Sequence, residues 1–377
     1  MIQVSPEHVS DGSALSKRSS FSFTALLAAT HQVFSGDEFD RLLPRSGADS
    51  TFGPLAETER IAFEFLIRGG KRFRPLITLA AYQACRQSTG DSVEVADVLP
   101  MDAVSRALIA IEVFHKASLV HDDIEDDDLF RYGHETLHRQ YDTATAINVG
   151  DYLVGLGYRI ITTDRAVLGS DRAADILHRL MDAHVKLTEG QGAEIAWRTA
   201  VDKTLTRDDA MGIYARKTSP AFEAALYTGV RLAGECQEFE RSLARYSRHL
   251  GIAFQILNDL SDWSGDANNK LVAKQDATSL RPTMLLAIAL DKSTPADRRR
   301  IENLLGGETG TGKPTPGLGD LFVSLDVFRD ARKMVIEHRC IANDVANEIS
   351  HRGLRQLLHQ LLEIVLPADQ ATSAAAG

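Results

Sequence analysis

The amino-acid sequence predicts an all-α protein that forms a single large helical bundle with a central cavity. Apolar residues recur mostly at helical spacing between Leu55 and Leu290. Long β-branched runs are rare, and the signals for two strands joined by a turn are absent. Several of these periodic segments reach or exceed about twenty residues, a length that suits a bundle enclosing a cavity.

The apolar period places each helix of the main bundle. In chain order these helices are expected at 54–67, 75–86, 101–126, 144–163, 171–191, 207–217, 219–232, 237–264 and 281–290. The third of them is apolar on almost every face along 107–120, so we expect it to be buried. A helix break is predicted just before Pro220, because a proline disfavours helical geometry in the preceding residue.

The ends of the chain differ in composition from its middle. Residues 1–40 are rich in Ser, Thr and Ala, with short apolar patches at 21–27, and are expected to be a flexible extension that can end in one helix, whereas 41–366 is expected to be the all-helical domain. Six Gly and two Pro at 306–319 predict a loop. The C-terminal helical pair after this loop is predicted at 320–347 and 354–366. The Ala-rich residues 367–377 are expected to be a frayed tail.

The bulk composition excludes several classes of function. With 42 Lys and Arg against 52 Asp and Glu, the net charge of −10 argues against a nucleic-acid partner. The distant cysteines have neither the spacing of a zinc site nor that of a disulfide framework; they are Cys85, Cys236 and Cys340. The sequence contains no signal-peptide pattern and no apolar run long enough for a membrane span. We therefore expect a cytoplasmic protein without stable membrane insertion.

The first acidic cluster lies at the end of the apolar helix 101–126. Asp122 and Asp126 stand four residues apart, so both carboxylates project from one helix face. Such a run can be a solvated helix end. Carboxylates at the end of a buried helix, however, need a metal ion or basic partners. Mg²⁺ binds one or two carboxylates together with phosphate oxygens, so the cluster favours a magnesium–diphosphate site.

A second helix also ends in oxygen-bearing side chains. Asn258 and Asp262 are four residues apart, and Gln255 and Asp259 share the adjoining stripe. Two such helix ends that face each other are able to clamp a diphosphate through bridging metal ions. The alternative is an ordinary polar helix end before the loop at 265–269.

The sequence GGKRFRP at 69–75 places two glycines before three cations. Glycine lets the backbone approach a ligand closely, and Lys71 and Arg74 are then candidates to bind a diphosphate. A surface turn is the alternative. His115 lies seven residues before Asp122 and therefore nearly above it on the same helix. Further candidate phosphate donors are Arg131, Lys217, Thr218 and Lys270.

Taken together, these motifs resemble the trans-isoprenyl diphosphate synthase (polyprenyl synthetase) family, over about residues 63–283. The resemblance implies an isoprenoid synthase-like fold, homodimers, and Mg²⁺ as cofactor. It assigns the homoallylic diphosphate to Lys71, Arg74 and His115. The implied metal ligands are Asp122, Asp123 and Asp126 in the first motif and Asn258, Asp259 and Asp262 in the second.

The same resemblance assigns further residues to the allylic diphosphate. The implied binding residues are Arg131, Lys217, Thr218, Gln255 and Lys270. Catalysis is implied for Asp122, Asp126, Arg131 and Lys217. Gln191 and Glu194 resemble the GQxxD segment of the family, and Arg281-Pro282-Thr283 resembles its KPT segment.

Two positions depart from the family pattern. Asn258 replaces the first aspartate of the second motif, so this ligand loses its charge. Tyr132 replaces the second arginine of an RRG segment, which removes a cation from the homoallylic site. These departures, with Asp262 and Asp266, keep open a terpene cyclase-like enzyme that ionises an allylic diphosphate without elongation. A non-catalytic subunit of a heteromeric synthase is a further alternative, disfavoured by the complete first motif.

The predicted function is a Mg²⁺-dependent prenyltransferase that condenses an allylic diphosphate with isopentenyl diphosphate to a linear trans-polyprenyl diphosphate. In the family, product length depends on side chains one or two turns before the first motif. Ala117 and Ser118 are small and leave room beyond farnesyl length, whereas Phe114 lies one turn deeper. A product of geranylgeranyl-like length is therefore expected.

Overall fold

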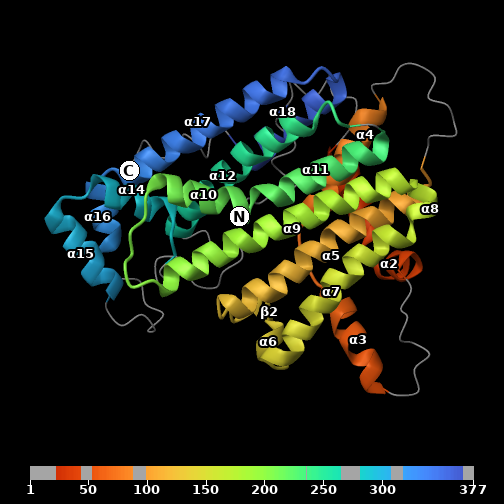
Figure 1. The fold of residues 1–377 in the computed structure, drawn as a ribbon, viewed down its shortest axis with the longest axis horizontal. Helices are drawn as coiled ribbons and strands as arrows, with labels where there is room; N and C mark the ends of the chain where they lie inside the picture. The colour runs from red at the N-terminus through yellow and green to blue at the C-terminus, as the bar shows by residue number, and fades with distance from the viewer. Residues whose placement is uncertain are drawn as a thin grey trace.

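The computed structural model describes residues 23–43, 53–87, 99–234, 236–264, 281–306 and 317–367. These residues form a helical bundle in which the long helices run side by side (Figure 1). The helices up to the middle of the bundle are α1 (Phe23–Val33), α2 (Gly36–Leu42), α3 (Gly53–Ile67), α4 (Phe73–Gln87), α5 (Met101–Glu125), α6 (Leu137–Gln140), α7 (Thr143–Thr163), α8 (Arg165–Leu168) and α9 (Ser170–Thr199). The later helices are α10 (Arg207–Lys217), α11 (Ser219–Ala233), α12 (Glu240–Ser264), α14 (Met284–Lys292), α15 (Pro295–Gly306), α16 (Leu318–Ser324), α17 (Val327–Glu348) and α18 (Arg352–Val365). The all-α prediction is confirmed.

Helix α5 is buried along most of its length, as its apolar sequence predicts. Its closest neighbour is α7, which runs antiparallel to it. Phe114 packs on Gly157, and one heptad along, His121 packs on Gly150. A Cβ atom at Gly157 would lie 2.7 Å from the Phe114 ring, so the two backbones can approach this closely only because both positions on α7 are glycine.

The second half of the predicted flexible extension is ordered. Helices α1 and α2 bury Leu26, Val33 and Phe39 against the core. Arg41 of α2 forms an ion pair of 2.8 Å with Asp102 at the start of α5. The extension was expected to end in one helix at most because its composition is rich in Ser and Ala. Residues 23–42 instead form two helices that pack on the core.

A two-stranded antiparallel sheet is a second departure from the prediction. Strands β1 (Phe130–Arg131) and β2 (His134–Glu135) pair just after the first acidic cluster. Tyr132 at φ 54° and Gly133 at φ 78° make the turn between them. The strands are too short for a period-2 pattern, which explains why no strand was predicted here. Their effect is to fold Arg131 back toward the end of α5.

Several helix boundaries also differ from the expectation. Helix α9 continues eight residues beyond the predicted end at Gln191. The predicted helix at 320–347 is divided into α16 and α17 by Asp326, which has φ 54°. Helix α14 begins three residues late because Thr283 acts as its N-cap and accepts a hydrogen bond from the backbone of Leu286 at 3.2 Å.

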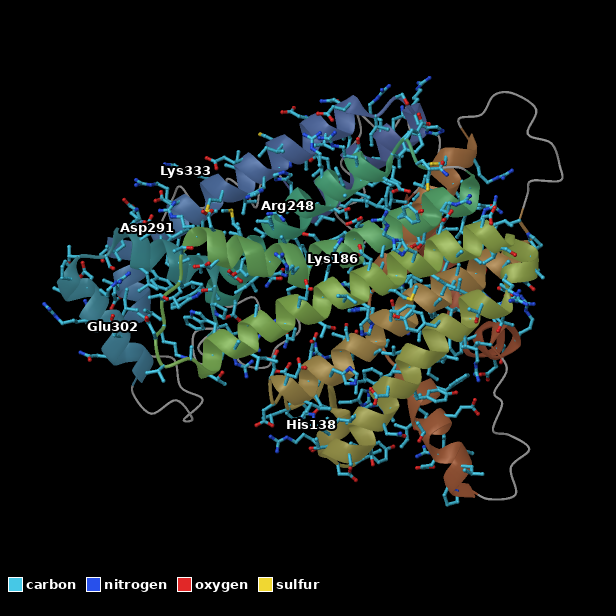
Figure 2. All side chains as sticks on the ribbon, viewed as in Figure 1. His138, Lys186, Arg248, Asp291, Glu302 and Lys333 are labelled. Carbon is cyan, nitrogen blue, oxygen red and sulfur yellow. The ribbon has the colours of Figure 1, made fainter. Side chains whose placement is uncertain are left out.

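The C-terminal pair closes the bundle. Leucines at helical spacing on α18 are buried. Helix α17 packs along α12 and also contacts α18. Charged residues such as Asp291, Glu302 and Lys333 are exposed on α14, α15 and α17 (Figure 2). Among the described helices, none is long and apolar enough to cross a membrane. The loop at 306–319 lies mostly, and the tail at 367–377 almost wholly, outside the described residues, and the central cavity stays a prediction.

Candidate active site

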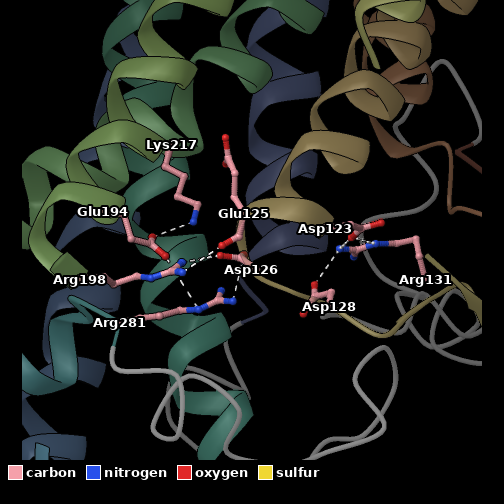
Figure 3. A network of polar contacts seen from close by, with 9 residues as sticks. All are labelled: Asp123, Glu125, Asp126, Asp128, Arg131, Glu194, Arg198, Lys217 and Arg281. Atoms are coloured by element: carbon pink, nitrogen blue, oxygen red, sulfur yellow. Dashed lines mark hydrogen bonds and ion pairs between the residues drawn. The ribbon is translucent and has the colours of Figure 1, made fainter. Parts of the chain in front are cut away.

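The first acidic cluster lies where α5 ends. Asp122 and Asp126 share a helix face, and Asp126 is the C-cap, its N–H bonded to the carbonyl of Asp122 at 2.9 Å. Asp123 points to another side, where only 2% of its surface is exposed. There it pairs with Arg131, which also contacts Asp128 at 3.1 Å (Figure 3). Arg131, which lies in β1, thus balances the charge of Asp123, one of the three motif aspartates.

Asp122 is the carboxylate of the cluster whose charge is least balanced. Burial raises its pKa to about 7, and the charges of Asp126 and Glu125 act in the same direction. Lys217 is the strongest cation that opposes this shift. Among the described residues, no hydrogen bond or ion pair reaches the Asp122 carboxylate. A buried carboxylate among other acidic groups is a position that a cation would stabilise.

Asp126 is held by two arginines, one on each oxygen. Arg198 Nη1 lies 2.7 Å from Oδ1, and Arg281 Nη2 lies 3.0 Å from Oδ2 (Figure 3). Arg198 comes from the last turn of α9, and Arg281 comes from the segment just before α14. Neither arginine was among the binding residues predicted from the sequence, although Arg281 lies in the KPT-like segment.

Glu194 links the last turns of α9 to the end of α10. Its Oε2 accepts a hydrogen bond from Lys217 Nζ at 2.7 Å, and its Oε1 lies 3.9 Å from Arg281 Nε. Lys217 thus pairs with Glu194 near the acidic end of α5 (Figure 3), and its role with substrate stays a prediction. Close packing makes this possible, since a Cβ atom at Gly190 would lie 2.6 Å from the backbone nitrogen of Lys217.

Two hydroxyl groups, from α10 and its C-cap, contact the end of α12. Thr218 donates a hydrogen bond of 3.1 Å to Gln255 Oε1. Tyr214 donates one to Asp259, which is 2% exposed, and accepts one of 2.8 Å from the backbone N–H of Met284. Asn258 and Asp262 are half-buried on this same helix end. Predicted residue Lys270 lies outside the described residues, as does Asp266.

The basic loop between α3 and α4 is strongly bent. Gly69 and Gly70 have φ values of 53° and 99°, and the Tyr132 ring packs directly on them. A Cβ atom at Gly69 would lie 2.8 Å from the ring, so glycine is required here for both conformation and space. Lys71 is exposed and Arg74 is half-buried.

Arg74 and His115 face the same region as the first acidic cluster. Burial lowers the pKa of Arg74, while the charges of Glu112, Tyr132 and Asp122 oppose the shift. Burial also lowers the pKa of His115 well below its usual range, and Arg74 adds to this effect. His115 is therefore neutral at physiological pH and able to donate one hydrogen bond. The basic loop and the acidic helix end thus influence each other electrostatically.

Sequence reasoning missed the residues that support the loop. Arg72 forms an ion pair of 2.7 Å with Glu112 and donates a hydrogen bond of 2.7 Å to the carbonyl of Leu66. Lys116 is fully buried, donates to the carbonyl of Arg68 at 2.5 Å, and lies 4.1 Å from the centre of the Tyr132 ring. The signal in the sequence was the pair of charged residues Glu112 and Lys116 within the mostly apolar run of α5.

The donor set of the site fits Mg²⁺. Asp122 and Asp126 offer carboxylate oxygens, and Mg²⁺ takes one or two carboxylates and completes its shell with water and phosphate oxygens. The amide oxygen of Gln191 and Oε1 of Glu194 are buried without a hydrogen-bond partner among the described residues. These oxygens, with Asp122, would be satisfied by a hydrated cation.

Comparison with known proteins agrees with this geometry. The sequence profile of the polyprenyl synthetase family matches residues 57–314. The chain is 28% identical over 316 residues to a short-chain isoprenyl diphosphate synthase of Methanothermobacter thermautotrophicus, covering 83% of this chain and 91% of that protein. It is 31% identical over 329 residues to a geranylfarnesyl diphosphate synthase of Natronomonas pharaonis, with the same two coverages.

The fold has solved counterparts. A geranylgeranyl pyrophosphate synthetase from Pyrococcus horikoshii superimposes with a TM-score of 0.73 at 24% identity, over 92% of this chain and 98% of that one. The family profile spans both acidic helix ends and the basic loop. The chain belongs to the polyprenyl synthetase family of trans-isoprenyl diphosphate synthases and is a prenyltransferase.

Proposed function

We propose that this prenyltransferase uses Mg²⁺ to condense an allylic diphosphate with isopentenyl diphosphate, giving a linear trans-polyprenyl diphosphate. One observation carries the proposal. Asp122, which forms no ion pair among the described residues, lies within electrostatic range of both Lys217 and Arg74. The acidic helix end therefore has a cation on the side of α10 and another on the side of the basic loop, as two adjacent diphosphate sites require.

Ionisation of the allylic substrate is the first step. The bond between C1 and oxygen breaks, and the electron pair leaves with the diphosphate. Mg²⁺, when bound by Asp122 and Asp126, supplies charge that stabilises this leaving group. Lys217 and Arg131 add fixed positive charge at the edge of the same site. Opposite unit charges at about 4 Å gain about 4 kcal/mol at an effective dielectric of about 20, so two or three contacts lower the barrier strongly.

Carbon–carbon bond formation is the second step. Lys71 and Arg74 hold the diphosphate of isopentenyl diphosphate, and neutral His115 donates a hydrogen bond to it. The homoallylic double bond supplies the electron pair of the new bond to the allylic carbon. A proton then leaves the resulting cation, and the released diphosphate accepts it. Tyr132 offers no charge to this site, so we expect a higher KM for isopentenyl diphosphate than an arginine there would give.

Product length is proposed to be near geranylgeranyl. Phe114 lies eight residues before Asp122, or about 12 Å along the helix. Its ring is fixed between Gly157 and Tyr158 of α7, with 4.8 Å between the two aromatic ring centres. A side chain held this firmly would stop a growing tail. We expect Phe114→Ala to lengthen the product by at least one isoprene unit, measured by mass spectrometry, whereas an unchanged product would remove Phe114 from this role.

We also infer a cytoplasmic homodimer. Met181 and Val185 of α9 and Ile147 of α7 are large apolar side chains that are 47%, 57% and 44% exposed. Such residues on adjacent helices favour an interface between copies of the chain. Light scattering on the purified protein should give twice the mass of the chain, and Val185→Glu should shift it toward the monomer.

The cyclase-like alternative rests on Asn258 and Tyr132. Membership of the polyprenyl synthetase family and the supported basic loop both disfavour it, because an enzyme without a diphosphate co-substrate has no use for Lys71 and Arg74. The alternative of a non-catalytic subunit is disfavoured by the complete first motif, Asp122, Asp123 and Asp126.

The test is to incubate the purified protein and Mg²⁺ with geranyl or farnesyl diphosphate, with and without isopentenyl diphosphate. Mass spectrometry of the polar and the hexane-extractable products identifies the reaction. A longer diphosphate that forms only with isopentenyl diphosphate supports the proposal. A hydrocarbon or terpene alcohol formed from the allylic substrate alone would replace it with cyclisation.

A further inference from the structure

Arg198 occupies an unusual position for a residue of the last turn of α9. Its guanidinium donates one hydrogen bond of 2.7 Å to Oδ1 of Asp126 and another of 3.0 Å to the backbone carbonyl of Glu125. The side chains of Arg198 and Asp126 are 25% and 7% exposed, so the pair is largely screened from water. Arg198 therefore binds both the last carbonyl of α5 and its C-cap carboxylate at the acidic cluster (Figure 3).

The position of Arg198 is fixed by the chain that follows it. Lys203 donates hydrogen bonds to the carbonyls of Trp197 and Arg198, at 2.9 and 2.5 Å. The Trp197 indole donates one of 2.8 Å to the carbonyl of Thr204. Together these contacts hold the last turn of α9 against the segment that leads into α10. These contacts therefore hold the guanidinium beside Asp126. Helix α9 reaches this point only because it continues eight residues beyond its predicted end.

Arg198 and a metal ion would compete for the same carboxylate. Arg281 faces Oδ2 of Asp126 at 3.0 Å, so an arginine stands at each oxygen of this predicted ligand. A divalent cation on Asp126 would be repelled by a guanidinium at hydrogen-bond distance from the same oxygens. Metal binding at Asp126 therefore favours displacement of one arginine. Arg198 is the more exposed of the two, at 25% against 13% for Arg281, and its hydrogen bond to the carbonyl of Glu125 keeps it beside the site after it leaves Asp126.

A diphosphate is the group that would receive the displaced arginine. The guanidinium fork matches phosphate oxygens in a bidentate way, and it remains charged at every physiological pH. The second acidic helix end offers less negative charge for metals, because Asn258 is neutral. The permanent positive charge of Arg198 would then compensate for part of the metal charge that this second helix end binds less well.

We propose that Arg198 is a substrate-binding residue that guards Asp126 in the empty enzyme and transfers to the diphosphate when substrate and Mg²⁺ bind. This inference rests on the proposed function, since it takes Asp126 as a metal ligand and a diphosphate as the occupant. It makes two opposite predictions for one variant. Arg198→Gln should bind Mg²⁺ alone more tightly, because a competing cation is gone, but should bind magnesium pyrophosphate more weakly.

The experiment titrates the full-length protein with MgCl₂ alone and then with inorganic pyrophosphate at saturating Mg²⁺, by calorimetry. Fluorescence of Trp197, recorded in a Trp263→Phe background, gives a second readout beside the titrated residue. We expect Arg198→Gln to tighten Mg²⁺ binding and to weaken pyrophosphate binding by about 3- to 10-fold each, the range of a partly buried ion pair. Arg198→Lys, which keeps the charge and loses the fork, should restore Mg²⁺ binding to near the wild-type value and pyrophosphate binding only in part.

Arg339→Gln is the matched control. Arg339 pairs with Glu363 at 2.5 Å and is 25% exposed, like Arg198, but it joins α17 to α18. It should change neither titration. If Arg198→Gln and Arg198→Lys both behave like this control, Arg198 only fastens α9 to α5 and the inference is overturned. Wild-type protein that binds neither probe would instead overturn the proposed function, and the inference with it.

Discussion

The two acidic helix ends are similar in sequence but are stabilised in different ways. At the end of α5, arginines hold Asp123 and Asp126, while burial raises the pKa of Asp122 to about 7. At the end of α12, Tyr214 donates a hydrogen bond to Asp259, and Thr218 donates one to Gln255. The first end therefore holds its carboxylates by ion pairs that a ligand can rearrange, whereas hydroxyl hydrogen bonds make the second end a framework.

This difference has a consequence for catalysis. A carboxylate balanced by an arginine can exchange that partner for a metal ion and a diphosphate. A carboxylate held by a buried tyrosine that also accepts a bond from Met284 is tied to the start of α14. We therefore expect the α5 end to dominate metal binding and ionisation, and the α12 end to set the distance between the two sites.

The largest expected effect comes from removing the unbalanced charge of the first end. Asp122→Asn should lower kcat by about 10³-fold or more, because the leaving diphosphate loses electrostatic stabilisation. Asp262→Asn at the second end should cost only about tenfold by the same reasoning. Steady-state kinetics with geranyl or farnesyl diphosphate measure both. Equal losses in the two variants would erase the contrast between the helix ends.

The framework role of the second end predicts a loss of stability. Tyr214→Phe removes the donor to Asp259 and the acceptor of the Met284 N–H, so it should cost about 1–3 kcal/mol in the free energy of unfolding. Chemical denaturation measures this. Tyr246→Phe, which removes a buried bond of 2.7 Å to the carbonyl of Leu358, is the control. It should cost a similar amount of stability without changing Mg²⁺ binding, whereas Tyr214→Phe should change both.

Adding charge to the second end should make the two ends more alike. Asn258→Asp introduces the carboxylate that the family usually has there, so the half-saturating Mg²⁺ concentration should fall about threefold to tenfold. Activity measured across a Mg²⁺ titration gives this value. The variant should also test whether Arg198 compensates for Asn258, since the effect of Arg198→Gln would then be smaller in the Asn258→Asp background.

The last expected effect concerns the folded protein without metal, whose stability should depend on pH. Because burial raises the pKa of Asp122, the folded state binds this proton more tightly than the unfolded state does. Stability should therefore fall as pH rises from about 4 to about 7, and level off above that. Thermal melting in EDTA should show the fall in the wild type and a smaller one in Asp122→Asn. Identical pH profiles would mean that Asp122 is well balanced in the folded protein.

Much of the fold and the site follows from local sequence. The helices α5, α10 and α11 begin and end within about one residue of their predicted limits, because apolar period and Pro220 mark them. The acidic motif spacing placed Asp122 and Asp126 on one face, as the structure has them. The short elements α2 and the β1–β2 pair escaped prediction, since they carry too few residues for a period to emerge.

The partners of the charged residues did not follow from local sequence. Arg131 was expected to bind diphosphate, and in the structure it holds Asp123; its role with substrate stays a prediction. Arg72 was passed over although it is the arginine that supports the basic loop, because its pairing with Glu112 spans 40 positions. The carboxylate that Arg198 meets is 72 positions away.

The sequence alone determined the helical class, the burial of α5 and the residue types of both acidic ends, because these depend on spacing within one helix. Tertiary structure alone decided which cation stands beside which carboxylate, since that depends on how α9, α10 and the β1–β2 turn meet the end of α5. Periodicity acts over a few residues, whereas charge pairing acts through space. The identity of the chemistry could thus be read from the motifs, while the charge balance of the empty site required the fold.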